Sequence, residues 1–83
     1  MDKSSEEFKL IQQRLRKAIT ESGMTLKEIS EKSGNTLQSL YRIMNRDFLP
    51  RLRNFVILCY ALQVSPDYIL GLTDNKTGKK NDK

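Results

Sequence analysis

The 83-residue sequence has no histidine, no tryptophan and only one cysteine, Cys59. Metal sites and nucleophilic catalytic sites are built mainly from histidine, cysteine and carboxylate groups at defined spacings. A glycine-rich phosphate loop and a carboxylate cluster at metal-ligand spacing are also missing from the sequence. We therefore expect no enzymatic activity, no cofactor and no small-molecule ligand, and we interpret Cys59 as a buried core residue.

Long apolar runs are absent as well. No run approaches the roughly 18 residues of a membrane-spanning helix, and no signal peptide is visible. A lone cysteine can form no internal disulfide, which suits a reducing compartment. Hydrophobic residues make up 37 % and charged residues 30 % of the chain, which is typical of a compact domain. We therefore expect one small cytoplasmic domain with no membrane partner.

The net charge of +5 is unevenly distributed along the chain. Residues 1–31 contain equal numbers of basic and acidic groups, whereas residues 32–53 contain five basic groups against the single acid Asp47. Residues 76–83 add four lysines and one aspartate. Because phosphate contacts dominate the affinity of proteins for nucleic acids, this distribution indicates a polyanionic partner. A charged surface that only increases solubility is the alternative.

Apolar residues recur at helical spacing throughout the chain, and no strand-like alternation occurs. The pattern predicts an all-α domain over residues 5–72, followed by a flexible basic tail over residues 73–83. The five expected helices cover about 5–21, 26–33, 37–45, 52–62 and a short segment at 66–72. The fourth helix has the widest apolar stripe, beginning at Leu52, and should be the most buried.

Helix-terminus signals support these boundaries. Ser4 with Glu7, and Thr25 with Glu28, match the capping-box pattern at the starts of the first two helices. Thr36 is the expected N-cap of the third helix. These signals place the second and third helices close together along the chain.

The segment 25–46 joins two short amphipathic helices at Gly34. A steep helix crossing needs a small side chain at the contact, here Ser30, and a residue tolerant of positive φ at the turn, here Gly34. Leu40 and Ile43, three residues apart, can anchor the second of these helices on the core. The arrangement is typical of a helix-turn-helix, whose second helix is free to enter a DNA groove.

Over residues 8–72 the chain resembles the Xre family of Cro/CI-type helix-turn-helix domains. The resemblance rests on GMTLKEISEKSGNTLQSLYRIMNR (23–46), on Pro50 and on YALQVSPDYILGL (60–72). It implies a five-helix, lambda-repressor-like fold with the helix-turn-helix at the second and third helices. It also implies a bacterial or phage-encoded regulator, such as a repressor, that binds a palindromic operator in double-stranded DNA as a homodimer.

Several positions depart from the family pattern. Leu26 stands where a phosphate-contacting glutamine is common, and Arg46 stands where a glycine often ends the third helix. With Arg46 there, either the helix runs on or Asn45 takes a left-handed cap. Ile19 and Met44 replace a buried arginine–glutamate pair. Because both replacements are apolar, no buried charge is left without a partner, and we expect the two side chains to touch in the core.

The third helix supplies the candidate base contacts. Its outward positions, which would meet base edges in the major groove, are Leu37, Gln38, Tyr41 and Arg42. Gln38 can bridge adenine N6 and N7, and Arg42 can bridge guanine O6 and N7. The simpler readings are a solvated Gln38 and an Arg42 that touches phosphate. Leu37 can meet a thymine methyl or pack at the helix start, and Tyr41 can contact sugar or phosphate or be a partly buried edge residue.

Candidate phosphate contacts lie at both ends of the third helix and in the segment after it. They are Asn35, Thr36, Asn45, Arg46, Arg51 and Arg53. Asn35 and Thr36 flank the helix N-terminus, where backbone amides favour an anion, although an N-cap role alone explains Thr36. Arg51 and Arg53 lie in the segment that the resemblance places along the DNA backbone.

One recognition helix reads only a few base pairs, so we expect a two-fold dimer that places two such helices about 34 Å apart. Tyr68 and Leu72 are the candidate interface residues. The alternative is that both complete the core of the monomer.

A protein-interaction module of the same fold, such as an antitoxin or anti-repressor, is the alternative function. The apolar Leu37 and the replacement at Leu26 favour it. RNA binding on a stacking surface is disfavoured, because the sequence has no interleaved aromatic residues on a sheet.

Overall fold

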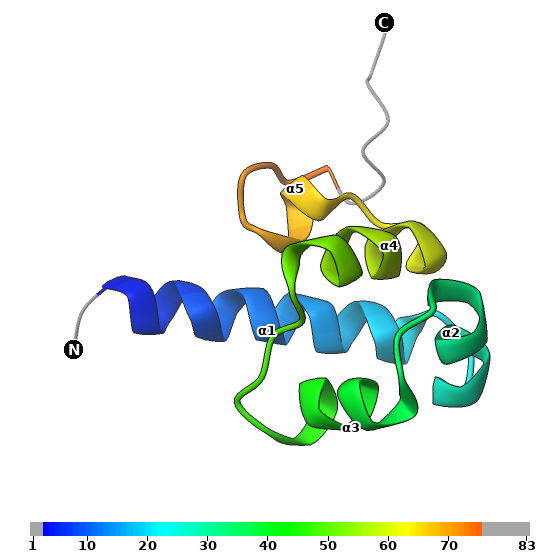
Figure 1. Ribbon diagram of the computed structural model, residues 1–83. Coiled ribbons are helices and arrows are strands. Elements are labelled where there is room, and N and C mark those ends of the chain that lie inside the picture. The colour runs from blue at the N-terminus through cyan, green and yellow to red at the C-terminus, as the bar shows by residue number, and fades with distance from the viewer. Residues whose placement is uncertain (1–2, 76–83) are drawn as a thin grey trace, which may run out of the picture.

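The computed structural model describes residues 3–75, which form five helices and no strand. These are α1 (Lys3–Glu21), α2 (Leu26–Ser33), α3 (Leu37–Asn45), α4 (Leu52–Leu62) and α5 (Pro66–Ile69). The long α1 runs through the middle of the molecule, with α3 on one side and α4 and α5 on the other (Figure 1). The predicted five-helix, all-α architecture is confirmed for the described residues. Most of the predicted basic tail, residues 76–83, lies outside them.

The helix-turn-helix forms through the local signals that the sequence carries. At the start of α2, Glu28 Oε1 accepts from the N–H of Thr25 at 2.8 Å, and Thr25 Oγ1 accepts from the N–H of Glu28 at 3.1 Å. At the end of α2, Gly34 adopts φ 75° and donates its N–H to the Ser30 carbonyl at 2.9 Å. Thr36 then caps α3. The capping box, the left-handed glycine and the N-cap are thus all confirmed.

Two helix termini differ from the prediction. Because α1 begins at Lys3, Ser4 lies inside the helix, and the expected capping box from Ser4 to Glu7 is wrong. The helix α3 ends at Asn45, followed by Arg46 in an extended conformation, with φ −136° and ψ 169°. Neither a longer helix nor a left-handed Asn45 occurs, because the extended Arg46 starts the loop directly.

The last helix is shorter than predicted. Ser65 Oγ accepts from the N–H groups of the first turn, as the N-cap signal indicates, but α5 ends at Ile69. Gly71 then takes φ 84° and turns the chain away from the helix axis. Leu72 therefore lies outside α5 and is 73 % exposed.

The hydrophobic core draws on all five helices. Its buried members are Leu15, Ile19, Ile29, Leu40, Ile43, Phe55, Leu58, Cys59, Leu62 and Ile69. Four of them come from α4, which confirms that this helix is deeply buried, but Leu52 at its first position is largely exposed. Burial also raises the pKa of the Cys59 thiol to about 12, so the thiol stays protonated and unreactive. Cys59 is therefore a core residue, as predicted.

Ile19 and Met44 both lie at this core. Ile19 is buried, and Met44 is partly buried and packed against the same cluster. Neither side chain points into solvent, which agrees with an apolar replacement of an ion pair. Direct contact between the two side chains stays a prediction.

Candidate nucleic-acid interface

The helix α3 is held against the body of the molecule by its apolar face and presents the opposite face to solvent. Leu40 and Ile43 on the inner face are fully buried. The four predicted base-contacting residues, Leu37, Gln38, Tyr41 and Arg42, are all exposed. The structure therefore leaves all four side chains accessible, and their contact with bases stays a prediction.

Polar side chains of α1 fix the C-terminal end of α3. Gln12, which is 4 % exposed, donates from Nε2 to the carbonyl of Ile43 at 3.3 Å and to that of Arg46. Arg16 Nε donates to the Ile43 carbonyl at 2.7 Å, and its Nη2 donates to the Arg46 carbonyl at 3.0 Å. The last carbonyls of a helix have no partner within the helix, so these donors replace a C-terminal cap.

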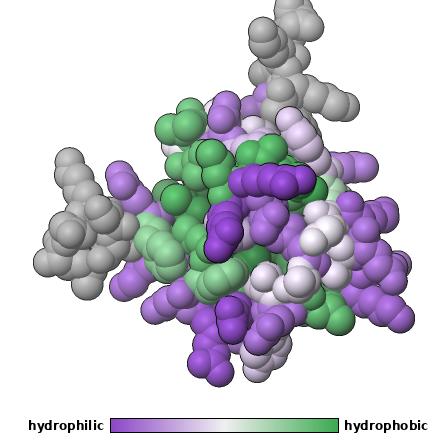
Figure 2. Space-filling view, viewed as in Figure 1, coloured by the Kyte–Doolittle hydropathy of each residue, from purple (hydrophilic) through white to green (hydrophobic). Residues whose placement is uncertain are grey.

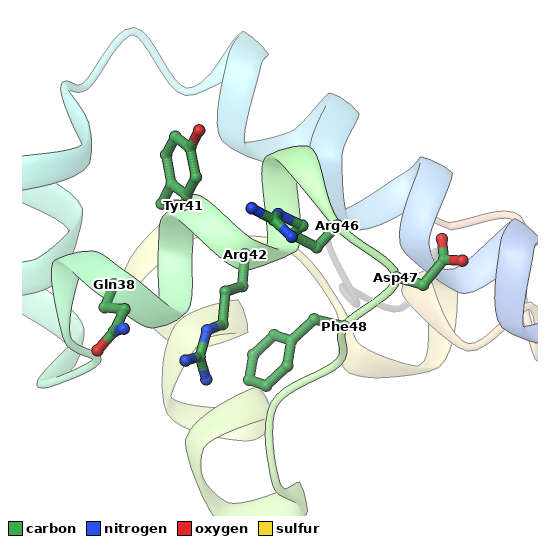
Figure 3. Close-up of a pocket in the computed structure, with 6 residues that line it drawn as sticks. All are labelled: Gln38, Tyr41, Arg42, Arg46, Asp47 and Phe48. Carbon is green, nitrogen blue, oxygen red and sulfur yellow. The ribbon is translucent and has the colours of Figure 1, made fainter.

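A hollow of about 470 Å³ lies along the exposed side of α3 and the loop that follows it. Its lining residues are Gln38, Tyr41, Arg42, Arg46, Asp47 and Phe48. In Figure 3 the side chains of Gln38 and Arg42 extend on one side of the helix, whereas Tyr41 extends on the other. Gln38 and Arg42 are one helical turn apart, which is why they share a side.

Two loop residues of this hollow, Asp47 and Phe48, were not among the predicted site residues. The guanidinium carbon of Arg42 lies 5.8 Å from the centroid of the Phe48 ring, within the range of a cation–π contact. Asp47 is exposed, and its negative charge belongs to the same hollow that Arg42 and Arg46 line. The uneven charge over residues 32–53 pointed to the region that contains Asp47. Phe48 had no comparable signal, because the helical periodicity of apolar residues ends with α3 and does not continue into the loop.

Five of the six predicted phosphate contacts are exposed, and the side chains of two of these, Thr36 and Asn45, also form hydrogen bonds within the domain. Arg46, Arg51 and Arg53 are exposed, and Arg51 makes no side-chain cap hydrogen bond at the start of α4. Thr36 Oγ1 accepts from the N–H of Ser39 at 3.0 Å, so its N-cap role is realised. Asn45 is exposed, and its Nδ2 donates to the Tyr41 carbonyl at 3.0 Å.

Asn35 requires a correction. Its side chain is 3 % exposed, and Nδ2 donates to Ser33 Oγ at 3.2 Å and to the Asn54 carbonyl at 3.3 Å. These bonds join the turn between α2 and α3 to α4, so the side chain faces the interior and not a phosphate. The inward orientation follows from the turn geometry, which the sequence pattern did not specify.

Leu26 packs against the hydrophobic core as a partly buried residue. A position at which the family often has a phosphate-contacting glutamine is thus used here for packing. The positive charge of the helix-turn-helix comes from α3 and the residues after it.

The predicted dimer residues lie in different surroundings. Tyr68 is partly buried, and the guanidinium of Arg14 lies 4.4 Å from its ring centroid. Leu72 is exposed, as are Leu70 and Leu10. Leu10 lies next to the segment that contains the other two leucines, because its Cδ2 is 3.6 Å from the position that a Cβ on Gly71 would occupy. Figure 2 shows apolar side chains gathered on this side of the molecule. Tyr68 thus belongs partly to the monomer core, whereas Leu72 lies on an apolar surface.

Residues 3–75 offer neither a membrane span nor a metal site. None of the helices there combines the length and apolar character needed to cross a membrane. The described part of the chain also contains no group of three or more histidine, cysteine or acidic residues that could hold a metal ion.

Comparison with known protein families shows that residues 15–69 match a helix-turn-helix family. The matched range begins within α1 and ends at the last residue of α5, so it contains the whole helix-turn-helix and the hollow beside α3. Searches of curated proteins and of solved structures gave no significant match. The family match covers well over half of the chain and confirms the resemblance found in the sequence. The protein belongs to the Xre/Cro/CI-type helix-turn-helix family, whose members are non-catalytic DNA-binding domains.

Proposed function

We propose that the protein is a transcriptional repressor that binds a palindromic operator as a homodimer, with α3 in the major groove. The observation that carries this proposal is the two-sided character of α3. Leu40 and Ile43 anchor it, while Gln38 and Arg42 extend from its exposed side. The Gln38 amide, which can both donate and accept hydrogen bonds, and the Arg42 guanidinium, which can donate two, are thus accessible to base edges in the folded domain.

Exposed arginines flank this helix and support binding to the DNA backbone. Arg46 follows α3, and Arg51 and Arg53 stand at the start of α4. Each phosphate neutralised contributes about 0.9 to the slope of log K against log salt concentration. Arg46, Arg51 and Arg53 therefore give binding a steep salt dependence, whereas Arg42 contacts a base. Such contacts position the domain, and the α3 side chains provide the sequence preference.

The second part of the proposal is the homodimer. The apolar surface formed by Leu10, Leu70 and Leu72 combines exposed leucines from α1 and from the segment after α5. The segment after α5, which contains Leu70 and Leu72, lies on the side of α1 away from α3 (Figure 1). A pair of domains joined through this surface would leave both recognition helices accessible, and operator binding then requires a spacing of about 34 Å between them.

A titration of labelled duplexes with the protein tests this function. One duplex carries the DNA upstream of the protein's own gene, and the other is a scrambled duplex of the same length and composition. We expect sub-micromolar binding to the first at physiological salt, weaker binding to the second, and a complex that contains two protein chains in analytical ultracentrifugation. Equal binding to both duplexes would refute sequence-specific regulation, and a one-chain complex would refute the dimer.

A protein-interaction module such as an antitoxin or anti-repressor is the second candidate. The observation that favours it is the pair of apolar or aromatic side chains at the exposed tip of α3, Leu37 at 50 % and Tyr41 at 54 % exposure. Leu26, which stands where glutamine is common in the family, no longer supports an interaction module, because its packing against the core explains the apolar residue at this position. Co-purification of a stoichiometric partner that blocks DNA binding, and whose release restores it, would favour this candidate.

A further inference from the structure

The aromatic residue of the α3–α4 loop is attached to the core on one side and faces the hollow on the other. Phe48 is partly buried and packs against the hydrophobic core cluster. Its backbone is also fixed, because the buried amide of Gln12 donates to the Phe48 carbonyl at 3.2 Å. A ring that is held at both its backbone and its inner edge is a rigid surface rather than a mobile loop side chain.

Arg42 lies near the ring of Phe48. The side chain of Arg42 is exposed, and its guanidinium carbon lies 5.8 Å from the Phe48 ring centroid. In Figure 3 the ring lies beside the extended side chain, and the guanidinium points out of the hollow on the same side as Gln38. Among the described residues, no ion pair joins Arg42 to a carboxylate, and the Phe48 ring lies within cation–π range of its guanidinium.

We propose that Phe48 is a positioning residue that determines the base specificity of the domain, by holding Arg42 for a bidentate contact with guanine. The proposal rests on the proposed function and extends its base-reading surface from α3 into the loop. Phe48 itself acts through Arg42 and reads no base edge.

The physical reason is preorganisation. A free arginine side chain samples many rotamers, and fixing it on binding costs part of the interaction free energy. An unrestrained Arg42 would also reach phosphates, which any DNA sequence offers. A cation–π contact with an aromatic ring uses none of the guanidinium N–H groups, so the fork remains free for guanine O6 and N7. Restricting the side chain therefore favours base contact over phosphate contact.

The test starts from a randomised duplex library, from which the wild-type protein selects its preferred sequence. Binding is then measured at one salt concentration for that duplex and for each single-base-pair variant of it. The proteins compared are the wild type, Arg42→Ala, Phe48→Leu, Phe48→Tyr and the double variant Arg42→Ala with Phe48→Leu. Leucine keeps an apolar group against the core but has no π face, whereas tyrosine keeps the ring.

We expect Phe48→Leu to reduce discrimination about two- to fivefold at the same base pair that Arg42→Ala affects, with the other positions unchanged. Phe48→Tyr should keep the wild-type preference. In the Arg42→Ala background, Phe48→Leu should reduce discrimination no further, because the group it positions is already absent. This pattern separates a positioning role from a general role in folding, which would weaken binding to all duplexes alike.

Three results would overturn the proposal. Wild-type discrimination in Phe48→Leu, or an equal weakening for every duplex, would each show that Phe48 does not position Arg42. Failure of the wild-type protein to select any sequence would refute the proposed function itself, and with it this inference. Thermal unfolding of each variant identifies a folding defect, and Phe48→Met then serves as a second apolar replacement with the same expected effect on discrimination.

Discussion

The buried amide of Gln12 in α1 donates to the carbonyl of Ile43 in the last turn of α3, at 3.3 Å. The same nitrogen also donates to the carbonyls of Arg46 and Phe48. One side chain from α1 thereby anchors the end of α3 and the start of the loop. The position of the hollow beside α3 thus depends on a residue that lies outside it.

The first prediction concerns this anchor. Gln12→Leu should lower the free energy of unfolding by about 1–3 kcal/mol, because the partly buried Phe48 carbonyl loses its donor and the carbonyls of Ile43 and Arg46 keep only Arg16. Gln13→Leu is the matched control, since the neighbouring Gln13 is exposed and should change stability by less than about 0.5 kcal/mol. Urea unfolding followed by circular dichroism measures both values. Equal stability of the two variants would show that Arg16 alone is sufficient to cap α3.

The second prediction concerns Cys59. Its pKa is raised from 9.0 to about 12 in the folded protein, so the folded state disfavours the thiolate. Below pH 9 the thiol is protonated in both the folded and the unfolded state, so its burial does not make stability depend on pH. Above pH 9 the thiol of the unfolded state loses its proton, whereas the buried thiol of the folded state keeps it. Stability should therefore fall between pH 9 and pH 12, by at most about 1.4 kcal/mol per pH unit from this group.

The control for this prediction is Cys59→Ala, which lacks the thiol but keeps every other titrating group. Its decrease in stability over the same alkaline range should be smaller than that of the wild type, even though the cavity lowers its stability at neutral pH. A thiol reagent should likewise react with the wild type only as fast as the protein unfolds. Parallel pH profiles for the two proteins would contradict the burial of the thiol.

Local rules explain which parts of the fold were predictable. The pair Thr25 and Glu28, and the turn at Gly34, follow from interactions between residues at most four apart, so the sequence pattern alone specifies them. Leu52 was misplaced because a stripe that covers most of a helix does not indicate which edge faces solvent. Helix existence and caps are thus accessible from sequence, whereas the orientation of a widely apolar helix is not.

The candidate site was only partly predictable for a related reason. The outward positions of α3 follow from helical periodicity, once Leu40 and Ile43 are assigned to the core. Gln12 and Phe48 are 36 residues apart, and their hydrogen bond depends on how α1 packs against the loop. Asn35 was assigned outward by its place in the chain, but the turn directs it inward. Tertiary interactions of this kind leave no periodic signal.

The third prediction separates base recognition from phosphate binding. Arg42→Ala should reduce the preference for the selected duplex over its variants by about 1–3 kcal/mol at one base pair, because alanine cannot form the two hydrogen bonds to guanine. Arg53→Ala should weaken binding to all duplexes alike and reduce the salt slope by about 0.9 per protein chain, because each chain neutralises one phosphate fewer. Fluorescence anisotropy at several salt concentrations measures both effects. A uniform weakening for Arg42→Ala would assign that residue to the phosphates as well.

The fourth prediction concerns Asp47, the acid that lies in the hollow with Arg42, Arg46 and Phe48. Its carboxylate is exposed on the surface that would approach the DNA, so it opposes the phosphates. Asp47→Asn should therefore strengthen binding to the selected duplex and to the scrambled duplex by a similar factor, about two- to fivefold at low salt. Asp74→Asn is the matched control, because it removes the same charge from the segment after α5, on the far side of α1 from α3 (Figure 1). If Asp47→Asn instead weakens binding at a single base pair, the carboxylate accepts a hydrogen bond from a base such as cytosine, and Asp47 itself reads the sequence.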